Sequence, residues 1–212
     1  MQGESELVSV IIPTYNRPER AIRAVDSVRA QTYRALEVVV VDDRSDASCQ
    51  RALRDALWSR DKVRLYVNDG PKGCAGARNV GLEAAKGAYA AFLDDDDEYL
   101  PTKIAAQVNE LASRPGVDVI VAGSRTEWRV AAEGQRHGWL DIEFRPSRLF
   151  QSCYVMCRRE ALDGVRFRCN HMDGATWRSS SMIRKPVCAS AKSSSSESHR
   201  RPNRCPGTSR RC

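Results

Sequence analysis

Short apolar runs alternate with amphipathic segments through the first part of the chain, and this alternation restricts its fold more than any other feature. The runs are rich in Val, Ile and Leu and occupy residues 7–12, 36–41, 63–67, 89–93 and 117–122. The segments between them place apolar residues three and four positions apart, as a helix with one buried face requires. Continuous apolar strands joined by helices are typical of a parallel sheet covered on both faces. The sequence therefore predicts an α/β fold with a mostly parallel sheet flanked by helices.

Beyond residue 123 the alternation breaks into shorter pieces. Runs at 126–130, 139–144 and 153–157 are separated by polar turns, and a helical RREAL segment follows the last of them. We expect these pieces to form a mixed extension of the sheet.

After about Arg168 the periodicity ends, and the chain becomes rich in Ser, Arg, Pro and Cys. The formal net charge of +7 comes entirely from this last segment, because acidic and basic residues are equal in number before it. Such a composition cannot bury enough apolar surface to order a core. We expect one domain over residues 1–168 and a basic, low-complexity, disordered tail over residues 169–212.

Several classes of protein are disfavoured by the same composition. No apolar run of about 18 residues could span a membrane, and the first residues lack the basic and apolar regions of a secretory signal. We therefore expect a cytoplasmic protein, with peripheral membrane association left open. The basic tail could contact anionic lipid or nucleic acid, but it has few aromatic residues to stack on bases, and no nucleic-acid partner is expected. Cys153, Cys157, Cys169 and His171 are too loosely spaced for a typical zinc site, so ordinary buried cysteines are favoured.

Polar side chains follow the predicted strands at the edge where ligands bind in an open parallel sheet. The residues at the four strand ends are, in chain order, Pro13, Thr14 and Tyr15, then Asp42 and Asp43, then Asn68, and then Asp94, Asp95, Asp96 and Asp97. One edge of the sheet thus collects six carboxylates.

The run of four aspartates indicates a cation site. Adjacent carboxylates at the end of an apolar strand repel one another, and their pKa values rise unless a cation compensates. Mg²⁺ and Mn²⁺ take oxygen ligands from one or two carboxylates and from substrate phosphates. The run therefore predicts a metal–diphosphate site, with a solvated acidic turn before the helix at Pro101 as the alternative.

The glycine pattern disfavours two common phosphate-binding folds. The turn after the first strand, PTYNRPER, lacks the glycines that cradle a dinucleotide pyrophosphate. The segment GPKGCAGARNVG does hold glycines, but it follows the third strand and has no Lys-Ser or Lys-Thr pair of a Walker loop. Arg78 in this segment could pair with phosphate or form a structural salt bridge, and the sequence leaves both open.

Three linked segments, VSVIIPTYNRP, AQTYRALEVVVVDDRSD and ARNVGLEAAKGAYAAFLDDDDEYLP, resemble family 2 glycosyltransferases of the GT-A fold over residues 7–168. The resemblance implies transfer of a sugar from a nucleotide-diphosphate donor, with a UDP-sugar expected, to a carbohydrate or other hydroxyl acceptor. It also implies inversion at the sugar carbon, Mn²⁺ or Mg²⁺ as cofactor, and a role in polysaccharide biosynthesis.

Site residues follow from the resemblance position by position. The expected nucleotide-sugar-binding residues are Pro13, Thr14, Tyr15, Asp42, Asp43, Arg78, Asp94 and Asp95. In the family pattern Asp43, supported by Asp42, meets the base, and Arg78 borders the nucleotide.

The family's DxD motif corresponds to Asp94, Asp95 and Asp96. Asp96 is the first expected metal ligand, Asp94 is the second, and Asp95 lies nearer the ribose. Asp97 matches the motif less clearly. The metal would neutralise the departing diphosphate.

An inverting transfer also needs a carboxylate to deprotonate the acceptor hydroxyl. In this family that Asp lies in an acidic pair before an aromatic and apolar helix, whereas the corresponding segment here reads RCNHMDGATWRSSSMIRKP. Asp173 is the one nearby carboxylate, and its surroundings do not match the motif. The catalytic base therefore stays unknown, and the alternative function is a non-catalytic nucleotide-sugar-binding remnant.

Overall fold

The computed structural model describes residues 5–122, 124–129, 137–142, 152–170, 174–178 and 187–188. Side chains are described for residues 5–122 and 153–168, and the other ranges are described by their backbone alone.

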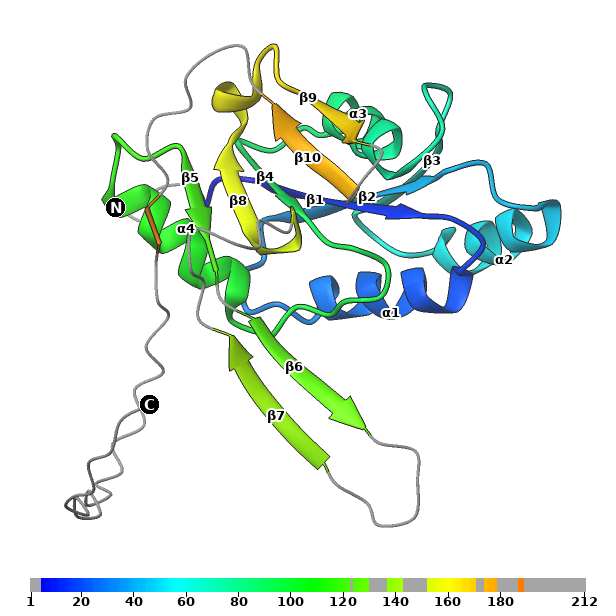
Figure 1. Cartoon of the computed structure of the whole chain (residues 1–212), viewed down its shortest axis with the longest axis horizontal. Coiled ribbons are helices and arrows are strands. Elements are labelled where there is room, and N and C mark those ends of the chain that lie inside the picture. Colours follow the sequence, from blue (N-terminus) through cyan, green and yellow to red (C-terminus); the bar gives the residue numbers. More distant parts are fainter. Residues whose placement is uncertain are drawn as a thin grey trace, which may run out of the picture.

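A seven-stranded sheet forms the centre of the described part of the chain (Figure 1). Its members are β1 (Val8–Thr14), β2 (Leu36–Asp42), β3 (Val63–Val67), β4 (Tyr89–Phe92), β5 (Val119–Val121), β8 (Val155–Arg158) and β11 (Val187–Cys188). They lie in the order β11-β5-β8-β4-β1-β2-β3. All neighbouring pairs in this sheet are parallel except those that β8 makes with β4 and β5. The predicted α/β fold with a mostly parallel sheet is confirmed.

Four helices cover the two faces of the sheet: α1 (Pro18–Arg29), α2 (Ala47–Leu57), α3 (Cys74–Ala84) and α4 (Lys103–Ser113). Figure 1 shows α1 and α2 on one face and α3 on the other. The apolar residues of α1, α2 and α4 share one core with Val10 and Ile12, while those of α3 share a second core with Ile11. Because successive strand residues point to opposite faces, both cores draw on the same strand, and every residue of β1 and β2 is buried.

The second half of the chain differs in part from the predicted extension. β8 does join the main sheet, but among the described strands β6 (Ser124–Arg129) and β7 (His137–Ile142) pair only with each other, in an antiparallel hairpin. The expectation that these two runs extend the sheet is therefore wrong, because a two-stranded hairpin satisfies its inner backbone groups without an outside partner. The RREAL segment forms a short 3₁₀ helix, Arg159–Leu162, and a second one covers Ser152–Tyr154.

Regular structure also occurs where the sequence predicts a disordered tail. β9 (Arg166–Asn170) pairs with β10 (Gly174–Arg178) in an antiparallel ladder, and β11 pairs with β5. These pieces differ from the expectation because pairing with an existing strand can order a segment that has no core of its own. Asp173 and the remaining tail residues lie outside the described residues, so the boundary at residue 168 stays a prediction.

A buried polar network joins the first two strands to the loop before β4. The Ser9 hydroxyl and the Lys86 backbone N–H donate to Oε1 of Glu37 at 2.5 and 2.6 Å, and Arg64 donates to Oε2 at 2.7 Å. Burial alone would raise the pKa of Glu37, but these hydrogen bonds and the Arg64 charge outweigh it and lower that pKa. Glu37 is therefore held in its charged form.

Replacing Glu37 with glutamine is expected to lower the free energy of unfolding by about 2 kcal/mol at pH 7. Because the folded pKa is lowered, the contribution of Glu37 is complete above its ordinary pKa of about 4.3 and is lost as the pH falls through the folded value. Urea unfolding at pH 7 and pH 3 measures the difference between wild type and Glu37→Gln, which should shrink at pH 3. Glu160→Gln, at an exposed position, is the control and should change stability by less than about 0.5 kcal/mol. If Glu37→Gln lowered the free energy of unfolding equally at both pH values, the lowered pKa of Glu37 would be contradicted.

Candidate active site

The ends of three parallel strands meet at one edge of the sheet and carry the acidic residues. Thr14 ends β1 opposite Asp42, which ends β2, and the aspartate run begins two residues after Phe92, the last residue of β4. The Thr14 hydroxyl donates to Oδ2 of Asp95 at 2.8 Å, across 81 residues of sequence. The structure therefore brings together the strand ends that the sequence singles out.

Asp95 points inward and anchors the acidic turn to β1. Its side chain is 3% exposed, and Arg17 lies 3.2 Å from its Oδ1. Burial raises the pKa of Asp95, while the Thr14 hydrogen bond and the Arg17 charge oppose the rise. Asp95 therefore serves to hold the turn in place as well as to add negative charge to it.

Asp96 points outward, toward the first turn of α1. Its side chain is 49% exposed and lies 3.3 Å from Arg17 and 3.8 Å from Arg20. Exposed ion pairs of this kind contribute little to stability and are screened by salt. The Asp96 carboxylate is therefore half-exposed beside two guanidinium groups.

Asp94, Asp97 and Cys153 form a group of side chains that could hold a metal ion. Their carboxylate oxygens and the Cys153 sulfur all lie within 4.8 Å of one another. Desolvation raises the pKa of Asp97 although the residue is exposed, a hydrogen bond with Cys153 opposes the rise, and the three neighbouring aspartates add to it. A dication between Asp94 and Asp97 would offset this repulsion, so these residues fit a metal site.

The chemistry of the group favours a hard cation. Burial, together with Asp97 and Asp94, raises the pKa of the Cys153 thiol, which is therefore protonated at neutral pH. Two of the three groups are carboxylates, whose oxygens suit Mg²⁺ and Mn²⁺. Cys157 is buried in β8, as expected for an ordinary core cysteine.

Arg78 lies at the inner side of the acidic turn. It is 4% exposed, and its Nη2 donates to Oδ1 of Asp94. Its Nε is buried and has no hydrogen-bond partner within the described residues. A buried guanidinium with a spare donor beside an acidic strand end can pair with a further anionic oxygen. Arg78 thus forms a salt bridge, one of the two alternatives that the sequence leaves open, and its pairing with phosphate stays a prediction.

Asp43 shapes the loop between β3 and α3. Its carboxylate accepts hydrogen bonds from Asn68 Nδ2 at 2.5 Å and from the Gly73 backbone N–H at 2.8 Å. Asp42 is also buried and accepts hydrogen bonds from the Ser45 backbone N–H and hydroxyl. Asp43 therefore faces the loop, and Asp42 supports the turn that carries it.

Tyr15 supplies an aromatic surface at the same edge. Pro13 and Thr14 are buried in β1, whereas Tyr15 is 42% exposed, with the Lys72 ammonium 4.5 Å above its ring. Exposed aromatic rings stack on nucleobases irrespective of the base. The edge thus combines an aromatic ring, buried carboxylates and a buried arginine.

Four residues of this edge were missed by the sequence reasoning: Arg17, Arg20, Lys72 and Cys153. Arg17 and Arg20 could have been found from the sequence, because they directly follow the first strand and lie one helical turn apart in PTYNRPER. Cys153 could not have been found in this way, because its position depends on how β8 pairs in the sheet.

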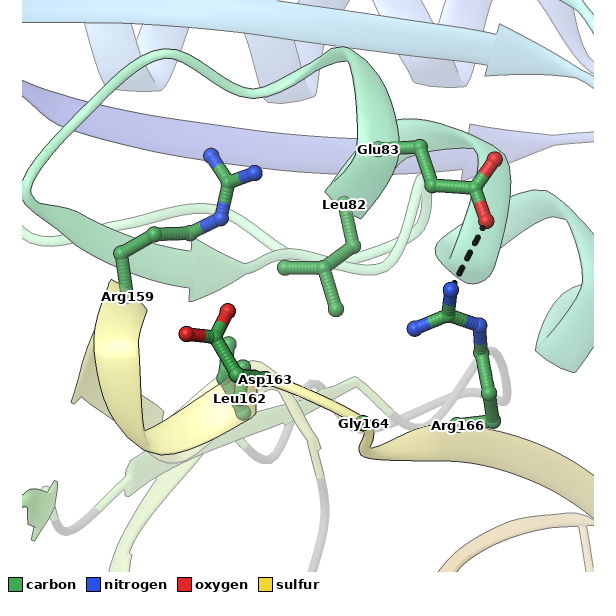
Figure 2. Close-up of a pocket in the computed structure, with 7 residues that line it drawn as sticks. All are labelled: Leu82, Glu83, Arg159, Leu162, Asp163, Gly164 and Arg166. Carbon is green, nitrogen blue, oxygen red and sulfur yellow. Dashed lines mark ion pairs between the residues drawn. The ribbon is translucent and has the colours of Figure 1, made fainter.

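A cavity of about 180 Å³ lies away from these residues (Figure 2). It is lined by Leu82, Glu83, Arg159, Leu162, Asp163, Gly164 and Arg166. The backbone N–H of Arg159 bonds to Ala88, just before β4 begins, whereas the acidic turn follows the end of β4. None of the lining residues belongs to the candidate site. Within the described ranges, no helix is long and apolar enough to cross a membrane.

The family model for glycosyl transferase family 2 matches residues 9–172. An uncharacterized glycosyltransferase of Rickettsia prowazekii is 42% identical over 118 residues, which are 55% of this chain and 36% of that protein. A UDP-Glc:alpha-D-GlcNAc-diphosphoundecaprenol beta-1,3-glucosyltransferase of Escherichia coli is 40% identical over 104 residues, 49% of this chain and 41% of that protein. The chain spans less than half the length of these relatives.

Two solved structures with the same fold illustrate the likeness. A mannosyltransferase of Pyrobaculum calidifontis, in complex with GDP-Man and Mn²⁺, matches with a TM-score of 0.58 at 23% identity over 76% of this chain and 47% of that one. Residues 1–349 of Staphylococcus aureus TarS, in complex with UDP, match with a TM-score of 0.59 at 20% identity over 76% of this chain and 50% of that one. These likenesses confirm the predicted GT-A fold.

Proposed function

Because the chain belongs to glycosyl transferase family 2, we propose that its acidic strand edge binds a nucleotide-diphosphate sugar for transfer to a carbohydrate or other hydroxyl acceptor. The observation that carries the proposal is the convergence of Asp94, Asp97 and Arg78 at the end of β4. Paired carboxylates suit a divalent cation, and the adjacent guanidinium suits a phosphate, so the three together suit a metal–diphosphate group.

The proposed metal is Mn²⁺ or Mg²⁺, held by Asp94 and Asp96. A carboxylate oxygen of Asp97 lies within 4.8 Å of one of Asp94, so Asp97 is the competing second ligand. The metal supplies Lewis-acid neutralisation of the leaving diphosphate. Arg78 adds a fixed positive charge beside Asp94, and its Nε, which has no hydrogen-bond partner among the described residues, is the proposed donor for a phosphate oxygen.

The proposed nucleotide lies over the ends of β1 and β2. Tyr15 stacks on the base, and Asp43 meets its polar edge from a position held by Asn68. Pro13, Thr14 and Asp42 form the buried floor beneath, and Asp95 positions the turn beside the ribose. A UDP-sugar is the proposed donor, which the Escherichia coli relative's name and the UDP complex of TarS support.

The proposed acceptor is a carbohydrate, and the proposed role is polysaccharide biosynthesis with inversion at the sugar carbon. The names of several relatives specify sugars linked to diphosphoundecaprenol, which supports an acceptor of that class. An inverting transfer needs a base, and Asp173 lies outside the described residues. The competing function is donor binding without transfer, which the unmatched base motif favours; a sugar-transfer assay separates the two.

Calorimetric titration of UDP with and without Mn²⁺ tests the donor site. We expect UDP to bind more tightly with Mn²⁺, because the ion bridges the diphosphate to the carboxylates. Asp96→Asn should weaken the Mn²⁺-dependent affinity by about 10- to 100-fold, and Asp97→Asn should weaken it less. Asp55→Asn, on the exposed face of α2, is the control.

The outcomes separate the parts of the proposal. An equal affinity for UDP with and without Mn²⁺ would show that the metal takes no part in nucleotide binding. Binding of GDP but not of UDP would show that the donor carries GDP rather than UDP. A larger effect of Asp97→Asn than of Asp96→Asn would reassign the second ligand.

A further inference from the structure

We infer that Asn79 is a positioning residue for the donor site, acting through Phe167 to hold Arg78 against Asp94. The inference rests on the proposed function, because it assigns a residue to the same site. It makes β9, near the end of the matched region, a part of that site rather than a separate appendage.

Asn79 forms a two-point clasp with the backbone of β9. Its Nδ2 donates to the Phe167 carbonyl oxygen at 3.0 Å, and its Oδ1 accepts from the Phe167 N–H at 2.9 Å. The amide therefore pairs with Phe167 as a neighbouring strand would, across 88 residues of sequence. Two hydrogen bonds to one residue fix the place of that residue along α3 more strictly than a single bond would.

The clasp sets the position of the Phe167 ring. This ring contacts Phe92, which ends the strand before Asp94, and also the Arg78 guanidinium. The ring is buried and packs edge-to-face on Phe92, with centroids 5.0 Å apart and an interplanar angle of 73°. The Arg78 Cζ lies 5.7 Å from the centroid of the same ring. Phe92 ends the strand that leads to Asp94. A single ring thus supports the strand and the guanidinium together.

Arg78 depends on such support because its own polar contacts do not fully orient it. Its Nη2 bonds to Asp94, and its Nε has no hydrogen-bond partner in the part of the chain that the structure describes. A long side chain with one anchoring bond can rotate about that bond unless a surface limits it, and an aromatic face is a favourable surface for a guanidinium. Displacing the Phe167 ring would therefore change the direction of the free Nε donor.

The chain offers a matched control between the same two elements. Glu83 of α3 and Arg166 of β9 form an ion pair at 3.2 Å, drawn as a dashed line in Figure 2. Both side chains are more than half exposed, at 62% and 52%. Loss of this pair also removes a link between α3 and β9, but it leaves the Phe167 backbone and ring in place.

The functional test compares UDP affinity in the presence of Mn²⁺ for the full chain and three variants. Asn79→Ala is expected to weaken binding about tenfold. Phe167→Leu keeps the clasp and removes the ring, and a similar loss is expected. Arg166→Ala should bind within twofold of wild type. Circular dichroism at the titration temperature ensures that only folded protein is compared.

A double-mutant cycle tests the same coupling without nucleotide. Urea unfolding of wild type, Asn79→Ala, Arg78→Met and the double variant should give a coupling of roughly tenfold in the unfolding equilibrium constant, because the two residues act through one ring. Effects that add to within about twofold would overturn the inference. So would an Asn79→Ala variant that binds UDP as tightly as Arg166→Ala. If the wild type binds no UDP, the proposed function fails, and the cycle still decides the role of Asn79.

Discussion

Replacing Asp94 with asparagine is expected to lower the Mn²⁺-dependent affinity for UDP by about 100-fold or more. Asp94 is common to the two proposed ligand pairs, Asp94 with Asp96 and Asp94 with Asp97, so its loss would disable either arrangement of the metal. It is also the counter-ion of the buried Arg78, which would be left uncompensated. Calorimetric titration of UDP with Mn²⁺ into wild type and Asp94→Asn measures the change.

Asp55→Asn removes the same charge from the exposed face of α2 and serves as the control for net charge. It should bind UDP as wild type does. An Asp94→Asn variant that keeps the wild-type affinity would show that the metal and the diphosphate are bound elsewhere.

Replacing Gly76 with alanine is expected to lower the free energy of unfolding by about 3 kcal/mol and to weaken UDP binding. A Cβ at Gly76 would lie 1.7 Å from the Pro71 carbonyl oxygen and 2.8 Å from its carbon. These are backbone atoms, so the whole loop before α3 must move. Pro71 accepts a hydrogen bond from Asn68, which in turn bonds to Asp43, so the displacement reaches the nucleotide-binding edge.

Gly116→Ala is the matched control, because an added Cβ at Gly116 meets no heavy atom within 4 Å. Its effect on the free energy of unfolding should stay within about 0.5 kcal/mol. Urea unfolding measures both variants, and UDP titration then measures the folded Gly76→Ala protein. Equal unfolding midpoints for the two variants would contradict the predicted clash.

The sequence was sufficient to predict the sheet and the edge that carries the acidic residues. β1 and β2 are buried along their whole length, and that is why their runs are apolar without alternation. Asp42 and Asp94 follow such runs, and the carboxyl ends of parallel strands lie at the same edge. Their proximity therefore follows from local pattern and strand direction alone.

The pairing of the later strands was beyond sequence reasoning. β8 is four residues long and lies antiparallel between β4 and β5, so it separates two strands that simple succession would pair. A short apolar run does not specify its neighbours, because pairing depends on the surrounding packing. The placement of Cys153 beside Asp97, and of Phe167 against Asn79, follows from this later part of the fold.

For the four aspartates, too, the sequence predicts some features and the packing decides the others. Their mutual repulsion was predictable, but their partners were not: Arg78 for Asp94, Thr14 for Asp95, and Arg17 and Arg20 for Asp96. Asp97 lies instead beside Asp94 and Cys153. The structure disperses the charge of the run over several elements, so the four residues are not equivalent ligands.

The most direct test of the metal–diphosphate site is an anomalous difference map at the manganese absorption edge, from crystals of the chain grown with UDP and Mn²⁺. The account predicts one manganese peak about 2.1 Å from a carboxylate oxygen of Asp94, with Asp96 or Asp97 as second ligand and the UDP diphosphate completing the coordination. Bound UDP without manganese at Asp94, or manganese bound only at other carboxylates, would contradict it.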